Sequence, residues 1–189
     1  MIENNDLLKK IEEWKDEITD NDKHIHFAFL EIFIEFERFL ANSFLEYALG
    51  EEGKENYKPT RRVEFHDKEH FEGLLKCDKQ YIDYIKKIQE VKKFIFIETN
   101  CPFNKVFSSS EFISTFKRMQ VIRNFIAHQS EESKNKYIKK VLEPSGISTF
   151  IKVDTFLKKI NRQRSISNYS IYIEVLRFHS EIICNPQSE

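Results

Sequence analysis

Arginine, asparagine and histidine occur together in the hexapeptide from Arg123 to His128. Histidine changes its protonation state near neutral pH, so His128 could take a proton from a hydroxyl group. The guanidinium of Arg123 keeps its charge and matches phosphate oxygens with a fork of N–H donors. The amide of Asn124 could orient His128 or hold a phosphate oxygen. These three residue types suit a site that acts on a phosphodiester bond, and the spacing alone makes this only a hypothesis.

RNA is the phosphodiester that this set of residues suits best, because its own 2′-OH serves as the nucleophile. His128 would be the general base, and Arg123 would stabilise the charge that develops on the phosphorane. The products would be a 2′,3′-cyclic phosphate and a 5′-OH. We therefore take Arg123, Asn124 and His128 as the candidate catalytic residues, and we expect the reaction to need no metal ion and no cofactor.

The same Arg-x4-His spacing occurs at Arg61 and His66, in a polar segment that contains Pro59. The stretch ending at His128 has a stronger helical context, because apolar residues at three- and four-residue steps predict a helix over 109–127. Ser108 and Glu111 have the spacing of a capping box at its start. The surroundings of the motif, rather than its spacing, favour the stretch from Arg123 to His128.

The helix constrains how the candidate residues meet. Asn124 and His128 are four residues apart and share a face. Arg123 and His128 are five apart, which places them about 140° apart around the axis at roughly 100° per residue. A two-fold dimer would let two motif helices pool their residues, so we expect a homodimer with a composite site.

The motif resembles that of the HEPN superfamily, in which an Arg is followed by a polar residue and, after a few spacers, by a His. Arg123, Asn124, Ala127 and His128 carry this resemblance, and residues 102–108 are similar to the segment that precedes the motif helix in ribonuclease-type members. The resemblance is specific over residues 100–130. Elsewhere it lies in the order and length of the helices.

The resemblance implies an all-α, up-and-down helical bundle that forms a homodimer. It also implies an endoribonuclease of a toxin–antitoxin or antiviral defence system, with RNA as substrate and a cognate antitoxin or defence protein as partner. One toxin subgroup carries, two residues after the His, a Tyr that a nucleotidyltransferase modifies. Ser130 stands at that position here, which argues against this mode of neutralisation, and the next tyrosine is Tyr137.

Other interpretations stay open. The chain could be a non-catalytic HEPN-like dimer that binds RNA or a nucleotide, or a regulatory subunit that docks onto another protein. His128 could be a histidine at a helix end, and Arg123 a surface ion-pair partner. His66 and His70 are four residues apart, but they lack the His-Glu-x-x-His order of zinc proteases, so we expect no metal site. His24 and His26 are expected to be solvated.

Helices are the elements expected to position these residues. The chain of 189 residues has only 4 Gly and 4 Pro, fewer than a β-sandwich or barrel requires. Apolar periodicity predicts helices over residues 5–19, 24–49, 69–98, 109–127, 134–142, 154–160 and from a cap at Ser165 or Ser167 to 184. A polar loop or insertion is expected at 51–68, with at most a short strand at 62–65. We expect a single domain over 1–189.

Charge is distributed unevenly along the chain. Residues 1–52 have a net charge of −9 and residues 117–164 a net charge of +8, although the whole chain has −1. A cationic half could attract a polyanion, so the basic segment is expected to bind RNA phosphates through Lys134, Lys136, Lys139 and Lys140. The same charges could instead form a solvated face or a docking surface.

The cellular location is predicted from the membrane-spanning and signal segments that the sequence lacks. There is no apolar run long enough to cross a membrane, and the N-terminus has no basic, apolar signal. Cys77, Cys101 and Cys184 match no disulfide framework or zinc pattern. We expect a cytoplasmic protein with reduced thiols and no association with membranes.

Overall fold

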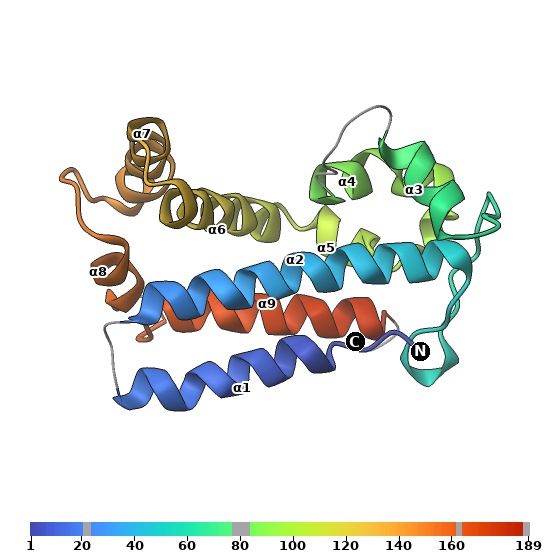
Figure 1. Ribbon diagram of the computed structural model, residues 1–189, viewed down its shortest axis with the longest axis horizontal. Helices are drawn as coiled ribbons and strands as arrows, with labels where there is room; N and C mark the ends of the chain where they lie inside the picture. Colours follow the sequence, from blue (N-terminus) through green and yellow to red (C-terminus); the bar gives the residue numbers. More distant parts are fainter. Residues whose placement is uncertain (21–23, 77–83, 162–163, 187–189) are drawn as a thin grey trace. The chain divides into compact units, whose positions relative to one another are not determined.

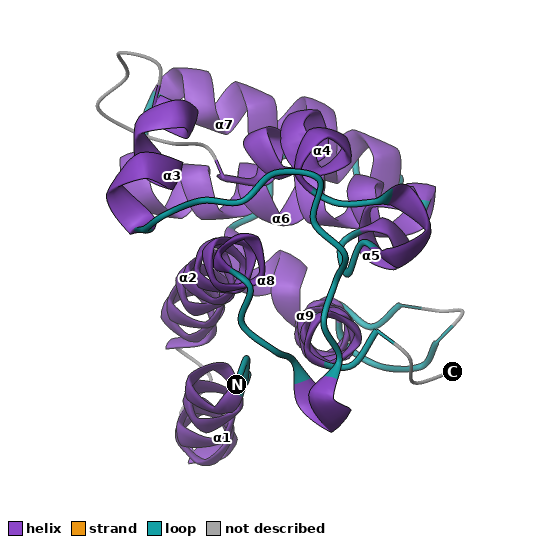
Figure 2. Ribbon diagram, turned by 90° about the vertical axis from the view of Figure 1, so that its right-hand side faces the viewer, coloured by secondary structure: helices purple, strands orange, loops and turns teal. Residues whose placement is uncertain are grey.

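The computed structural model describes residues 1–20, 24–76, 84–161 and 164–186. Within these ranges the chain forms nine α-helices and no β-strand, so the predicted all-α fold class is confirmed (Figure 2). Figure 1 labels the helices α1 (Asn5–Asp20), α2 (Ile25–Leu49), α3 (Lys68–Lys76), α4 (Tyr84–Ile95), α5 (Asn104–Ser108), α6 (Ser110–His128), α7 (Glu131–Tyr137), α8 (Val153–Lys158) and α9 (Asn168–Cys184).

The chain divides into two compact units. The unit that carries the Arg123–His128 stretch, called the motif unit below, comprises Leu7–Glu35 and Ser110–Arg177. The second unit comprises Met1–Asp6, Phe36–Ser109 and Phe178–Glu189. The long helices α2 and α9 each contribute residues to both units. The single-domain organisation over 1–189 stays a prediction.

Aromatic side chains from the first half of α2 organise the core of the motif unit. Phe29 and Phe33 are completely buried. The ring of Phe33 stacks on that of Phe116 in α6, with centroids 5.1 Å apart, and the ring of Phe29 contacts that of Tyr172 in α9 at 6.0 Å. Aromatic pairs at these distances stabilise a core beyond the burial of their area. The two contacts fix α6 and α9 against α2.

Phe44 has the same organising role in the second unit. Its ring makes edge-to-face contacts with Phe71, Phe96 and Phe103. The buried hydroxyl of Tyr47 donates to the carbonyl of Ile183 at 2.7 Å, which ties the end of α2 to the end of α9. The Phe-rich composition of the chain thus supplies a core of interlocking rings.

The polar segment 51–68 is irregular, as predicted, but it is not wholly exposed. Tyr57 is buried, and its ring meets that of Tyr47 edge to face. Gly53 lies so close to Tyr47 that a Cβ there would be 2.3 Å from the hydroxyl oxygen. No strand forms at 62–65, in agreement with the expectation of at most a short one there, and Arg61 forms an isolated antiparallel bridge to Phe96.

Two predicted helix boundaries are wrong. The helix expected over 69–98 is represented by α3 and α4, and α4 ends at Ile95 because Phe96 pairs with Arg61. Residues 77–83 of that prediction lie outside the described residues. The capping box is also wrong, since Ser108 is the last residue of α5 and its hydroxyl donates to the carbonyl of Lys105 at 3.3 Å.

Other boundaries agree with the prediction. Helix α6 covers Ser110–His128, as expected for most of 109–127. The hydroxyl of Ser167 accepts a hydrogen bond from the backbone N–H of Ser170 at 3.1 Å, so Ser167 caps α9 and Ser165 does not. None of the helices in the described residues combines the length and the apolar character needed to cross a lipid bilayer.

Candidate active site

Helix α6 buries one face and presents the motif beside it. Phe112, Phe116, Met119 and Ile122 are buried, at the three- and four-residue steps of one helical face. The next positions turn away from this face, so Arg123 is half-buried and Asn124 and His128 are exposed. The apolar period that predicted the helix thus also determines which motif side chains reach the surface.

Arg123 and Asn124 are joined by a hydrogen bond. Nη1 of Arg123 donates to Oδ1 of Asn124 at 3.0 Å. This bond occupies the amide oxygen, so the NH2 group of Asn124 remains as a donor. Because Asn124 and His128 share a helix face, the bond draws the guanidinium toward the face on which His128 lies. The side chain of Arg123 therefore compensates for part of the offset predicted from the backbone.

His128 is the last residue of α6 and lies at a sharp bend in the chain. Gln129 adopts a left-handed backbone conformation with φ 47°, and its N–H donates to the carbonyl of Phe125 at 3.0 Å. The hydroxyl of Ser130 then accepts the N–H of Ser133 at 3.2 Å and caps α7. His128 is exposed, so its imidazole is accessible to a substrate.

The predicted RNA-binding lysines fall into two groups. Lys134 and Lys136 form ion pairs within α7, with Glu131 at 3.1 Å and Glu132 at 2.6 Å. Lys139 and Lys140 lie on the single π-helical turn that follows, Ile138–Leu142. Both are exposed, and neither has a carboxylate partner among the residues that the structure describes. The second pair therefore carries the uncompensated positive charge of this segment.

An exposed aromatic ring adjoins this basic segment, and the sequence analysis did not single it out. Phe150 is 45% exposed, and Nζ of Lys134 lies 5.4 Å from its ring centroid. The ring also meets Phe125 of α6 and Tyr137 of α7 edge to face. The only signal in the sequence is a Phe in a loop that also contains Ile147 and Ile151, which does not show whether the ring is buried or exposed.

Tyr137 belongs to the core of the motif unit. It is completely buried, its ring stacks on that of Phe125 at 5.1 Å, and burial raises the pKa of its hydroxyl. The exposed position two residues after His128 is Ser130, whose hydroxyl caps α7. Position 130 is thus not a tyrosine, and the hydroxyl of Tyr137 is not accessible for modification.

The second Arg-x4-His stretch has a different role. Nη1 of Arg61 donates to the carbonyl of Ala48 at 3.0 Å, which satisfies a backbone acceptor at the end of α2. His66 is exposed, and its ring stacks on that of His70 with centroids 5.9 Å apart. In the described residues no three His, Cys, Asp or Glu side chains gather in an arrangement that could hold a metal ion.

The expectation that His26 is solvated is wrong. The side chain is only 25% exposed, and its Nδ1 lies 2.6 Å from Oδ1 of Asp154 in α8. The pair connects the start of α2 with the start of α8. Sequence reasoning missed it because the two residues are far apart in the chain.

Comparison of the chain with protein-family models, with curated proteins and with solved structures found no match.

Proposed function

We propose that the chain is a metal-independent endoribonuclease of the HEPN type, a cytoplasmic homodimer that acts in a toxin–antitoxin or antiviral defence system. The observation that carries this proposal is the placement of the motif. The hydrogen-bonded Arg123 and Asn124 lie near the C-terminal end of α6, and the last residue of this helix is the exposed His128. A basic segment with an exposed aromatic ring follows directly in the chain.

In the proposed reaction the 2′-oxygen of RNA attacks the adjacent phosphorus atom. The bond from phosphorus to the 2′-oxygen forms, and the bond to the 5′-oxygen breaks. His128 takes the proton from the 2′-OH, and the leaving 5′-oxygen receives a proton from water or from the protonated imidazole. Negative charge on the phosphorane is stabilised by the guanidinium of Arg123. The balance of the reaction needs no oxidant, reductant or metal ion.

Asn124 would hold Arg123 in place. An arginine side chain has considerable rotamer freedom, and a positioned charge is more effective than one that must reorganise during the reaction. The 3.0 Å hydrogen bond from Nη1 to Oδ1 restricts the guanidinium. The amide NH2 of Asn124 would remain available to donate to a phosphate oxygen. The three residues thus have separate roles as base, cation and positioning group.

Substrate binding would combine charge with stacking. Lys139 and Lys140 would contact phosphates, which supports affinity without sequence preference. Phe150 would stack on an unpaired base, as exposed aromatic residues do in proteins that bind single strands. This combination favours a single-stranded or looped RNA over a continuous duplex.

The deciding experiment incubates the purified chain with total RNA in EDTA and compares it with His128→Ala. His66→Ala is the matched control, because His66 is also exposed and also ends an Arg-x4-His stretch. We expect cleavage by the unmodified chain and by His66→Ala, and a loss of about 10²- to 10⁴-fold for His128→Ala. Full cleavage by His128→Ala would refute the proposal. Binding of RNA without cleavage would favour a non-catalytic RNA-binding dimer instead.

A further inference from the structure

A second possible site lies at the other end of α6. An open pocket of about 650 Å³ is lined by the first turns of α6, the turn at 144–146, the chain after α8 and the start of α9. Its polar lining includes Arg118, Lys159, Arg164, Asn168 and Tyr172. All of these residues belong to the motif unit. The volume is in the range of roughly 300–1,000 Å³ that is typical of sites for small organic molecules.

The pocket carries uncompensated positive charge. Nη2 of Arg164 lies 3.1 Å from Oε1 of Glu111, so these two charges offset one another at its edge. Arg118 and Lys159 have no carboxylate partner within the described ranges of the chain. Two cations that line the same concave surface would attract an anion, and one with two negative charges would match them.

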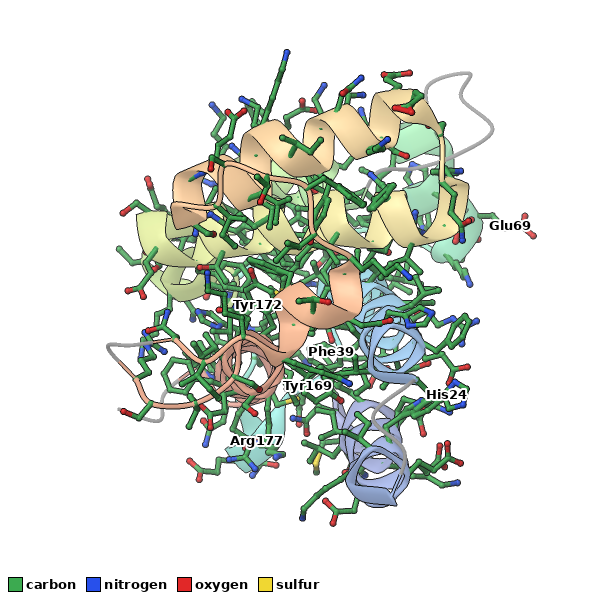
Figure 3. All side chains as sticks on the ribbon, turned by 90° about the vertical axis from the view of Figure 1, so that its left-hand side faces the viewer. His24, Phe39, Glu69, Tyr169, Tyr172 and Arg177 are labelled. Atoms are coloured by element: carbon green, nitrogen blue, oxygen red, sulfur yellow. The ribbon has the colours of Figure 1, made fainter. Side chains whose placement is uncertain are left out.

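Tyr172 adds a hydroxyl group to this surface. The residue is only 6% exposed, and it lines the pocket. Figure 3 labels Tyr172 on the side of α9 that faces α6. Burial raises the pKa of Tyr172 to about 12, although Arg118 acts in the opposite direction. The hydroxyl therefore keeps its proton at neutral pH and can donate a hydrogen bond to a ligand.

The start of α9 contributes to the same surface. Asn168 is the first residue of this 17-residue helix, and its amide is held by a hydrogen bond to the carbonyl of Phe156 at 2.9 Å. The N-terminal end of a helix carries a partial positive charge that favours anions. Its dipole thus adds to the charges of Arg118 and Lys159.

We propose that this pocket binds the phosphate monoester of a small organic molecule. Arg118 and Lys159 would bind the dianionic phosphate, and the hydroxyl of Tyr172 would donate to one of its oxygens. The remaining volume would hold the organic part, because a free phosphate ion would occupy only a small fraction of 650 Å³. The site uses none of the residues assigned to RNA cleavage, so it is independent of the proposed ribonuclease function.

The test titrates the full chain with adenosine 5′-monophosphate as the probe, in an isothermal calorimeter. Adenosine and inorganic phosphate serve as its two halves. We expect the monophosphate to bind at least about tenfold more tightly than either half, because charge-assisted contacts and the organic part both contribute. His128→Ala should bind the monophosphate like the unmodified chain.

Three variants locate the site. Arg118→Gln and Lys159→Gln should each weaken binding by at least about tenfold, and Tyr172→Phe by about threefold to tenfold. Lys117→Gln is the matched control, since Lys117 is an exposed cation on α6 that does not line the pocket. It should change the affinity by less than about twofold. The melting temperature of each variant is measured to check that the chain remains folded. Lys159 is exposed, so Lys159→Gln is expected to leave the melting temperature nearly unchanged.

Four results would overturn the proposal. The monophosphate fails to bind at millimolar concentration, or it binds no more tightly than inorganic phosphate. Alternatively, Lys117→Gln weakens binding as much as Arg118→Gln, which would indicate general charge attraction. Loss of binding in His128→Ala but not in Arg118→Gln would place the ligand at the candidate active site instead.

Discussion

Arg123 donates a hydrogen bond from Nη1 to Oδ1 of Asn124, its neighbour in the chain, at 3.0 Å. Consecutive helix residues point about 100° apart, so only a long side chain can bridge them. The bond moves the guanidinium toward the face that Asn124 shares with His128. The angle of about 140° between Arg123 and His128 is therefore the angle between their backbone positions around the helix axis, and the guanidinium and imidazole groups are expected to be separated by a smaller angle.

Replacement of Arg123 by Lys tests whether the shape of the cation matters as well as its charge. A lysine keeps the positive charge but loses the planar fork of donors and the hydrogen bond to Asn124. We expect single-turnover cleavage of an RNA oligonucleotide to fall by roughly 10²- to 10³-fold. Lys117→Arg, an exchange of cations on the same helix at a residue that lines neither site, should cleave normally. Equal activity of Arg123→Lys and the unmodified chain would contradict a role for the fork.

Mixing two inactive variants tests whether the site is shared between subunits. If Arg123 of one subunit acts with His128 of its partner, an Arg123→Ala and His128→Ala heterodimer contains one intact site. Random exchange should then restore about a quarter of the unmodified activity, because half of the dimers are mixed and each has one site of two. Analytical ultracentrifugation is used to check that the mixed variants form dimers. No recovery in a verified heterodimer would place both residues of a site in one chain.

The salt dependence of RNA binding tests whether Lys139 and Lys140, rather than the ion-paired lysines of α7, contact the phosphates. Lys139 and Lys140 have no carboxylate partner in the described residues, whereas Lys136 is 2.6 Å from Glu132. The double variant Lys139→Gln with Lys140→Gln should reduce the slope of log affinity against log salt by about 1.4, at about 0.7 per phosphate contact. The control, Lys136→Gln with Glu132→Gln, removes a pair without net charge and should leave the slope nearly unchanged. An unaltered slope in the first variant would assign this face to another role.

Phe150 provides a test of single-strand recognition. Loss of one stacked base typically costs about 1–3 kcal/mol, so Phe150→Ala should weaken binding of a single-stranded oligonucleotide by about 5- to 150-fold. Binding of a duplex should change little. Fluorescence anisotropy in the His128→Ala background measures both without cleavage. Phe178→Ala is the control, because Phe178 is 61% exposed and lies far along the chain in the second unit. A similar loss in both variants would indicate a general effect of exposed aromatic residues.

Local regularities in the sequence determined most of the helices. The apolar steps from Phe112 to Ile122 predicted α6 because the helical period alone places these residues on one face. The same period placed Asn124 and His128 together on another. The cap of α9 was predicted to within two residues, since Ser165 and Ser167 can both accept a backbone N–H. Such features depend on residues a few positions apart, and the sequence shows them directly.

The tertiary structure decided which of several local options the chain uses. Ser108 has the spacing of a cap but belongs to α5, and consecutive serines offer equivalent caps until the neighbouring helix forms. Arg61 and Arg123 have the same spacing to a histidine. Only the contact of Arg61 with the carbonyl of Ala48, 13 residues earlier, gives it a structural role.

The surfaces where ligands would bind also depended on distant residues. Nothing in the sequence separates the exposed Phe150 from the buried Phe156, or shows that Arg118, Lys159 and Tyr172 line one pocket. Arg118 belongs to α6 and Tyr172 to α9, and Lys159 follows the end of α8. A periodic pattern shows which side of a helix is apolar, but it does not identify what that helix packs against. Packing between distant segments determines this, and with it the concave surfaces where charges converge.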